Sequence, residues 1–294
     1  MKEEDSRVRG NGMEGRRGFL KSVVLSTLAQ PALAGSEPDA IAIPRRGGSV
    51  RTIPVALIQS DSIPEQVERN LHQMEGLAVR AARSGARWIM FHEGTVCDYT
   101  PRLKELAEEV PNGTATARMG KLAQRLRCFI SFGLSETHQG RYYISQVFVG
   151  PNGFLYRYRK TWIWREERDK GYRNEWARYD PGTGPELFQL DGINATCFIC
   201  ADGEAPRCIG RAAELNPQVV FYPNNRARLP DFEVFGQRAK QIKAPMLVTN
   251  RVGQSWTEQC VGGCVVYSKS GAVLAKANRE GEEEILLYPL EIDV

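Results

Sequence analysis

Histidine is scarce in this chain, with only three residues among 294. A structural metal site of cysteine and histidine usually takes four ligands at matched spacing. Cys260 and Cys264 stand four residues apart and would need two further ligands that the sequence does not offer at such spacing. We therefore expect no metal site, and interpret these two cysteines as strand packing or as a disulfide pair.

An excess of charge of one sign is also missing. The chain has 39 Lys and Arg against 35 Asp and Glu, a net charge of +4. Its most basic stretch, from Arg157 to Arg173, also contains Glu166, Glu167 and Asp169. Nucleic-acid binding relies on clustered basic residues. The even mixture predicts a solvated loop here and no nucleic-acid partner.

Long hydrophobic runs are absent, because no segment reaches the roughly 20 apolar residues of a membrane-spanning helix. Near the start, Arg16-Arg17-Gly-Phe-Leu-Lys21 precedes a weakly apolar stretch that ends in Ala32-Leu-Ala34. This order is typical of a twin-arginine signal peptide over residues 1–34. A linker rich in Gly, Pro and Arg follows over residues 35–50. The alternative is an amphipathic helix belonging to the domain.

The signal predicts that the twin-arginine translocase exports the protein to the periplasm or the medium, without stable membrane insertion. The seven cysteines are an odd number, so at least one thiol stays unpaired. A dense disulfide framework would be unusual in a chain of this size. Because twin-arginine export carries folded proteins, an enzyme with a reactive thiol would fold in the reducing cytoplasm first.

Apolar runs alternate with helical periodicity along residues 51–294. A Ser62–Glu65 capping box opens the first predicted helix, which continues to Gly85. Turn signals at Pro151-Asn-Gly153 and Ser268–Gly271 predict two hairpins. Further helices are predicted over 115–126, 205–215 and 232–243. We predict strands over 53–58, 87–91, 128–134, 144–149, 154–159, 194–199, 219–222, 246–249, 262–267, 272–276 and 284–290. The pattern indicates one α/β domain of mixed sheets covered by helices.

Three chemically different side chains each close a predicted strand. Glu93 follows Trp88–Phe91, Lys160 ends Phe154–Lys160, and Cys200 follows Ala195–Ile199. Strand ends can meet at one edge of a sheet. A thiol needs a base to become a good nucleophile, and an attacked carbonyl needs positive charge beside its oxygen. The three residues are therefore candidate base, electrophile and nucleophile.

Each of the three residues also has a purely structural interpretation. Cys200 could be a packed core cysteine, as we assign to Cys197, and the glutamate and the lysine could be solvated strand ends. The surrounding motifs favour the chemical interpretation. They are Phe91-His-Glu-Gly94, the hairpin that closes on Arg159-Lys-Thr161, Ile199-Cys-Ala-Asp-Gly-Glu-Ala-Pro-Arg207, Thr249-Asn-Arg-Val-Gly253 and Gly262-Gly-Cys-Val-Val266. In this order, over about residues 53–290, the chain resembles the carbon–nitrogen hydrolase (nitrilase) superfamily.

The resemblance implies a four-layer α-β-β-α sandwich that assembles into homodimers or larger homo-oligomers. It implies a mechanism without metal or cofactor, in which Glu93 is the base, Cys200 the nucleophile, and Lys160 with the Ala201 N–H the oxyanion site. A second glutamate of the family positions substrate. Glu175, which precedes Pro181-Gly182, is the first choice, with Glu166 or Glu167 as alternatives. Asp202 would brace the turn.

Residues Ala201-Asp-Gly203 are similar to the amidase and carbamoylase branches. They favour hydrolysis of a non-peptide carbon–nitrogen bond, in a linear amide or N-carbamoyl amine, through a cysteine thioester that releases ammonia or an amine. A nitrilase, or a binding protein without activity, is the alternative. His92 and Arg207 depart from the family pattern and are expected to flank the pocket. Loops over residues 96–106, 162–180 and 224–230 are expected to shape it, with Trp162, Trp164 and Trp176 as candidate aromatic walls.

Overall fold

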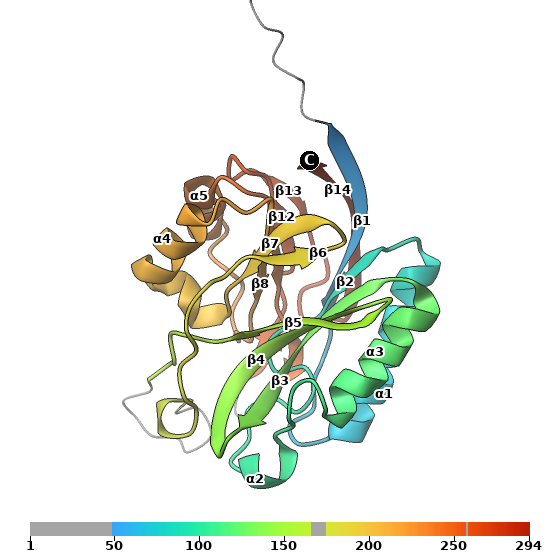
Figure 1. Cartoon of the computed structure of the whole chain (residues 1–294), viewed down its shortest axis with the longest axis vertical. Helices are drawn as coiled ribbons and strands as arrows, with labels where there is room; N and C mark the ends of the chain where they lie inside the picture. Colours follow the sequence, from blue (N-terminus) through green and yellow to red (C-terminus); the bar gives the residue numbers. More distant parts are fainter. Residues whose placement is uncertain (1–48, 166–174, 257) are drawn as a thin grey trace, which may run out of the picture. The chain divides into compact units, whose positions relative to one another are not determined.

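Two six-stranded sheets form the centre of the protein, as the computed structural model shows over residues 49–165, 175–256 and 258–294 (Figure 1). The first sheet has the order β14-β1-β2-β3-β4-β5 and the second β13-β12-β9-β8-β7-β6. The strands of the first sheet are β1 (Val50–Gln59), β2 (Trp88–Met90), β3 (Phe129–His138), β4 (Arg141–Gly150), β5 (Gly153–Arg159) and β14 (Glu284–Asp293). Those of the second are β6 (Phe188–Leu190), β7 (Ile193–Cys197), β8 (Val219–Pro223), β9 (Met246–Thr249), β12 (Val265–Tyr267) and β13 (Val273–Lys276).

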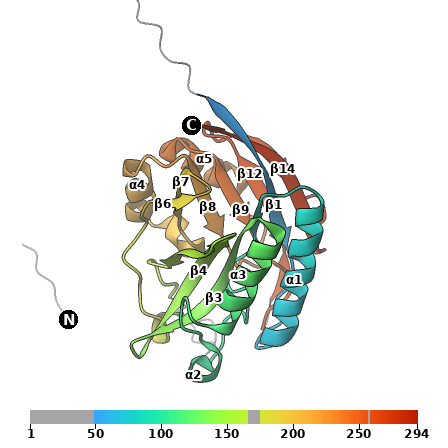
Figure 2. The ribbon, with the colours of Figure 1, turned by 45° about the vertical axis from the view of Figure 1, so that its right-hand side comes forward.

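Helices cover the outer faces of both sheets (Figures 1 and 2). Helices α1 (Val67–Arg83) and α3 (Thr114–Leu126) pack on the first sheet through one apolar cluster. Helices α4 (Pro206–Glu214) and α5 (Phe232–Ile242) lie on the second sheet, within a larger cluster that also fills the space between the sheets. Burial of these apolar faces is the main favourable term in folding. The α-β-β-α sandwich predicted from the sequence is therefore confirmed.

Parallel pairing brings the ends of successive strands to the same edge of each sheet. Strands β1, β2 and β3 are parallel neighbours in the first sheet, and β7, β8 and β9 in the second. The chain leaves β2 just before Glu93 and leaves β7 just before Cys200. In open α/β sheets, ligands bind beyond the carboxyl ends of the parallel strands. The fold thus carries both residues to the region where a site is expected.

Most predicted elements are present within two or three residues of their expected bounds, including both hairpins, β4–β5 and β12–β13. The prediction of a capping box at Ser62–Glu65 was wrong. Helix α1 begins at Val67, and Ser62 instead donates a hydrogen bond of 2.8 Å to the carbonyl of Thr95. Several short elements were not predicted. They are α2 (Leu103–Leu106), β6, β10 (Val252–Gln254), β11 (Gln259–Val261) and the 3₁₀ helices η1 (Glu175–Ala177) and η2 (Cys200–Glu204).

The start of the domain lies slightly earlier than predicted. Val50, assigned to the linker, is already paired with Asp293 in the β1–β14 ladder. The predicted signal peptide, residues 1–34, and the rest of the linker up to residue 48 lie outside the described residues. Within the described part of the chain, no helix is long and apolar enough to cross a membrane. The same part holds no cluster of three or more His, Cys, Asp or Glu side chains suited to a metal ion.

Candidate active site

Glu93, Lys160 and Glu175 come from three separate segments and meet in the interior. Glu93 lies in the turn after β2, Lys160 directly follows β5, and Glu175 opens η1. The ammonium of Lys160 donates hydrogen bonds of 2.9 Å to Glu93 Oε1 and 2.8 Å to Glu175 Oε1. Glu93 and Lys160 have no exposed surface, and Glu175 is almost as deeply buried. The structure therefore brings together three of the residues predicted from the sequence.

Buried charges of this kind must be paired, or they would be neutralised. Burial alone would lower the pKa of Lys160, but the carboxylates of Glu175 and Glu93 outweigh it and raise that pKa well above its usual range. Lys160 is therefore a fixed ammonium. Burial raises the pKa of Glu175, with the charge of Lys160 acting in the opposite direction. A second bond, from the Trp164 N–H to Glu175 Oε2 at 2.8 Å, holds this carboxylate in place.

The two glutamates differ in their remaining oxygen. Both oxygens of Glu175 are engaged, one by Lys160 and one by the backbone of Trp164. Glu93 Oε2 is buried and accepts no hydrogen bond from the residues that the structure describes. An unengaged carboxylate oxygen is the atom that a general base uses to take a proton. This asymmetry favours Glu93 over Glu175 as the base.

Cys200 is the first residue of η2, in the strained turn that follows β7. Its backbone φ is +44°, a left-handed conformation that side-chain-bearing residues rarely adopt. The Tyr222 hydroxyl donates a 2.8 Å hydrogen bond to the Cys200 carbonyl. Glycine is required at position 203, where the chain passes close to the same hydroxyl, because a Cβ there would lie 2.3 Å from the Tyr222 oxygen. Strain held by its surroundings is common at functional sites.

Asp202 braces this turn, as predicted. Its Oδ2 accepts hydrogen bonds from the Ile199 N–H at 2.9 Å and the Tyr158 hydroxyl at 2.8 Å. Its Oδ1 accepts from the backbone N–H groups of Thr161, at 3.0 Å, and Trp162. The residues after Lys160 are thereby tied to the turn that carries Cys200. One buried carboxylate thus fixes the relative position of two candidate catalytic groups.

The Cys200 side chain is a thiol at neutral pH. Burial raises its pKa to about 11, and the Glu93 carboxylate acts in the same direction, while Arg226 and Lys160 oppose them. A nucleophilic thiolate therefore has to be generated by proton transfer to a nearby base. Cys197 is fully buried, and desolvation raises its pKa well above the usual range. It belongs to the apolar cluster between the sheets, as predicted.

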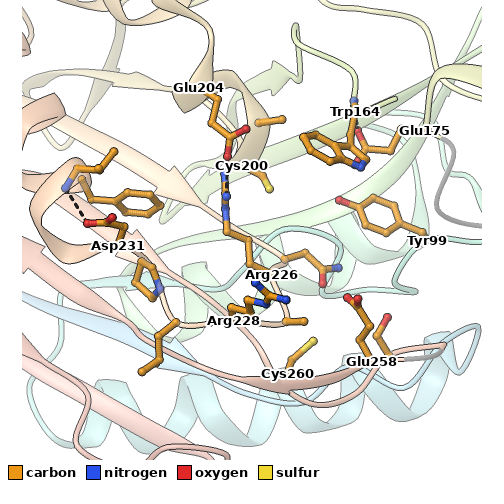
Figure 3. A pocket seen from close by; sticks show the side chains of 18 of the residues that line it. Tyr99, Trp164, Glu175, Cys200, Glu204, Arg226, Arg228, Asp231, Glu258 and Cys260 are labelled. Atoms are coloured by element: carbon orange, nitrogen blue, oxygen red, sulfur yellow. Dashed lines mark hydrogen bonds and ion pairs between the residues drawn. The ribbon is translucent and has the colours of Figure 1, made fainter. Parts of the chain in front are cut away.

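A cavity of about 640 Å³ opens beside Cys200 (Figure 3). Its wall includes Cys200, Ala201 and Glu175, whereas Glu93 and Lys160 lie behind that wall. All three predicted loops contribute. The segment around β11 also contributes residues to the wall, and no sequence signal predicted this. The remaining lining residues are Tyr99, Trp164, Glu204, Asn225, Arg226, Ala227, Arg228, Leu229, Pro230, Asp231, Val234, Phe235, Arg238, Ser255, Trp256, Glu258 and Cys260.

Two expectations about the pocket were wrong, and a third was only partly right. His92 is completely buried away from the cavity, with its Nδ1 2.8 Å from the Glu93 carbonyl oxygen, and burial lowers its pKa to about 3. Arg207 also lies outside the cavity wall, and its guanidinium stands 5.1 Å from the ring centre of Trp162. Of the three tryptophans proposed as aromatic walls, Trp164 lines the cavity, whereas Trp162 and Trp176 do not.

Several site residues were not singled out from the sequence. Tyr99 and Arg226 fell within predicted pocket loops, but loop conformation decides which side chains turn inward. Burial raises the pKa of Tyr99, and the nearby carboxylates of Glu175 and Glu93 raise it further, so this phenol stays neutral. Glu166 and Glu167, the alternatives to Glu175, lie outside the described residues.

The predicted oxyanion role of the Ala201 N–H stays a prediction, although Ala201 follows Cys200 and lines the cavity.

Of the cysteine pair that resembled a metal or disulfide motif, Cys264 packs in the core. Its sulfur accepts from the Asn250 N–H at 3.4 Å.

Comparison with known proteins identifies the family. The model of the family described as carbon-nitrogen hydrolase matches residues 54–293, so the chain belongs to this family. A nitrilase of Pyrococcus abyssi is 26% identical over 245 residues, which cover 82% of this chain and 90% of that protein. An (R)-stereoselective amidase of Pseudomonas sp is 26% identical over 199 residues, covering 65% and 68%. The crystal structure of an amidase from Nesterenkonia sp. matches with a TM-score of 0.71 at 21% identity, covering 85% and 94%.

Proposed function

We propose that this protein hydrolyses a non-peptide carbon–nitrogen bond in a linear amide, through a thioester on Cys200. The observation that carries the proposal is the arrangement at one cavity. A neutral thiol and Glu175 line its wall, and Glu93 and Lys160, which are joined to Glu175 by the Lys160 ammonium, are buried behind it. A base with an unengaged oxygen and a fixed ammonium are the two groups that thiol attack on an amide requires.

The proposed reaction begins when Glu93 takes the proton of Cys200. The thiolate attacks the amide carbon, and the developing oxyanion is held by the Lys160 ammonium and the Ala201 N–H. Protonated Glu93 then gives its proton to the departing nitrogen, which leaves as ammonia or an amine. Glu93 next removes a proton from water, which attacks the thioester. The carboxylic acid is released and the thiol regains its proton.

Glu175 has a positioning role in this scheme. It accepts a hydrogen bond from the Lys160 ammonium, which also donates to Glu93, and is itself held by the Trp164 N–H. It also lines the cavity, where it would contact a bound substrate. No metal or cofactor takes part in the proposed steps.

Amides are preferred because Ala201-Asp-Gly203 follows the nucleophile, as in the amidase and carbamoylase branches. Similarity to the Pseudomonas amidase supports this choice. N-carbamoyl amines are the second substrate class, since their scissile bond is also an amide-type bond. The similarity to the Pyrococcus nitrilase makes nitrile hydrolysis a third candidate. A binding protein without activity would have no need of the Glu93–Lys160–Cys200 set.

An ammonia-release screen across small amides, N-carbamoyl amines and nitriles tests the proposal. We expect release from at least one amide by the wild type and none by Cys200→Ala. Activity confined to nitriles would replace the amide assignment. If no compound is hydrolysed and iodoacetamide labels Cys200 no faster than an ordinary thiol, the binding-protein interpretation holds instead.

We also propose export by the twin-arginine translocase and assembly into homodimers or larger homo-oligomers. The first rests on Arg16-Arg17 and the segment that ends at Ala34, and the second on the family resemblance alone. Sedimentation of the purified protein tests the assembly. A monomer at micromolar concentration would contradict it.

A further inference from the structure

Three arginines line the cavity that holds Cys200, and one of them is already neutralised. Arg226 forms a 2.7 Å ion pair with Glu204 and donates a 3.0 Å hydrogen bond to Asn224 Oδ1. Figure 3 shows Arg226 and Glu204 pointing toward each other beside Cys200, with Arg228 below them in the view. This pair forms part of the wall and leaves little net charge there.

The other two guanidinium groups have no such partner among the described residues. Within the described part of the chain, neither Arg228 nor Arg238 has a carboxylate oxygen within 4 Å. Arg238 is held in position, because it donates a 3.2 Å hydrogen bond to the Tyr222 hydroxyl and lies 4.5 Å from the centre of the Phe235 ring. Arg228 is exposed on the loop between β8 and α5 and lines the same cavity. Two cations are thus available to a ligand.

Most carboxylates of the wall are engaged elsewhere. Glu175 is paired with Lys160, and Glu204 with Arg226. Asp231 caps helix α5, where its Oδ1 accepts the N–H groups of Glu233 and Val234. Glu258 is a further carboxylate of the wall and lies beside Cys260 in Figure 3. A substrate with an amino group is therefore the competing possibility that an experiment must separate.

We infer that Arg228 and Arg238 bind a carboxylate of the substrate, a few atoms away from the carbonyl that Cys200 attacks. Guanidinium groups suit this task because their planar N–H donors match the geometry of a carboxylate. The substrate class would be monoamides of short dicarboxylic acids, or carbamoyl derivatives of amino acids, which place the same anion at a similar distance. This inference rests on the proposed function and narrows it.

Kinetics on matched substrates test the inference. Glutaric acid monoamide carries a carboxylate where pentanamide carries a methyl group, and 5-aminopentanamide carries an ammonium. We expect kcat/KM for the anionic amide to exceed that for pentanamide tenfold or more. N-carbamoyl-β-alanine against propylurea repeats the comparison for carbamoyl substrates. Equal rates within each pair, or a preference for the cationic amide, would overturn the inference.

Substitution locates the effect. Arg228→Gln should reduce the preference for glutaric acid monoamide over pentanamide by roughly tenfold, and Arg238→Gln should act in the same direction. Arg211→Gln is the matched control. Arg211 is exposed on α4 and paired with Glu214, outside the cavity. An unchanged preference in both cavity variants would assign the anion to another site and contradict the inference.

A binding measurement separates failure of this inference from failure of the proposed function. Glutarate, which has no amide to cleave, should slow alkylation of Cys200 by iodoacetamide, and Arg228→Gln should weaken that protection. Pentanol serves as the neutral control ligand. Protection without any amide hydrolysis would keep the anion site and reject the proposed reaction. Amide hydrolysis without protection by glutarate, and without preference for anionic substrates, would support the proposed reaction and reject the anion site.

Discussion

At the scale of single residues, the site depends on how one lysine is shared. Lys160 is completely buried and donates to two carboxylates from different segments. A buried cation costs several kcal/mol of desolvation unless such partners are present. Removing it would leave two buried carboxylates facing each other. Its role in stability and its proposed role in catalysis therefore have to be separated.

Lys160→Gln tests both roles. We expect kcat to fall by roughly a hundredfold or more, because the charge beside the oxyanion is lost. We also expect a lower thermal unfolding midpoint, because the two carboxylates then lack a buried counter-charge. Adding Glu175→Gln should restore part of the midpoint without restoring kcat. A double variant that regains both would show that Lys160 acts through stability alone.

Glu93→Gln tests the base. Since the pKa of the Cys200 thiol is raised to about 11, very little thiolate exists at pH 7, and proton transfer to Glu93 must supply it. We expect the variant to alkylate more slowly with iodoacetamide at pH 7. The negative charge of Glu93 by itself raises the pKa of the thiol. Faster alkylation in the variant would mean that Glu93 acts only as a charge.

At the scale of elements, the turn after β7 is the critical feature. Asp202 collects hydrogen bonds from the segments on either side, including the Ile199 N–H and the Tyr158 hydroxyl at its Oδ2. Backbone donors next to Lys160 occupy the other oxygen. Loss of an acceptor would leave buried donors unsatisfied, which costs about 1–3 kcal/mol each.

Asp202→Asn places an amide NH₂ where one oxygen accepts two hydrogen bonds. We expect a loss of about 1–3 kcal/mol in the free energy of unfolding by urea, and a lower kcat because the turn that carries Cys200 is released. Asp231→Asn is the control for stability, since asparagine caps a helix as well as aspartate does. A fully stable and fully active Asp202 variant would show that the brace is dispensable.

The long elements could be predicted from sequence, and the short ones could not. Helix α3 and strands β8 and β9 carry clear periodicity or continuous apolar runs, and the structure has them close to the predicted bounds. Strands such as β6 and β10 are three residues long, and only pairing with a neighbour defines them. The Ser62–Glu65 motif failed because Ser62 found tertiary partners, the carbonyls of Gly94 and Thr95, in place of a helix end.

At the scale of the whole molecule, the meeting of the strand ends could be predicted from the sequence. The side chains that form the wall of the cavity could not be predicted. The turns after β2, β5 and β7 bring Glu93, Lys160 and Cys200 to one region because the sheets fix where strands end. Arg226 and Arg228 line the cavity because residues distant in the sequence fix the backbone of their loop. The Asn250 side chain, for example, donates to the Arg226 carbonyl at 3.0 Å. That contact joins residues 24 positions apart in the sequence.

Export is a prediction for the whole chain. Because a receptor reads both arginines, Arg16→Lys combined with Arg17→Lys should leave the full-length protein in the cytoplasm. Deletion of residues 1–34 should leave an active enzyme, since the first strand begins only at Val50. Cell fractionation and N-terminal sequencing provide the measurement. A wild-type chain that stays in the cytoplasm and begins at Met1 would refute the signal peptide.

The most direct measurement of the central proposal follows the acyl group on Cys200. The wild type is mixed with a hydrolysed amide, quenched in acid within milliseconds, and analysed by intact mass and peptide mapping. We expect the mass of the acyl group on the peptide that contains Cys200, no adduct in Cys200→Ala, and no ammonia release by that variant. Cys197→Ala should retain both adduct and turnover. Ammonia release by Cys200→Ala, or an acyl group on another residue, would contradict a thioester mechanism at Cys200.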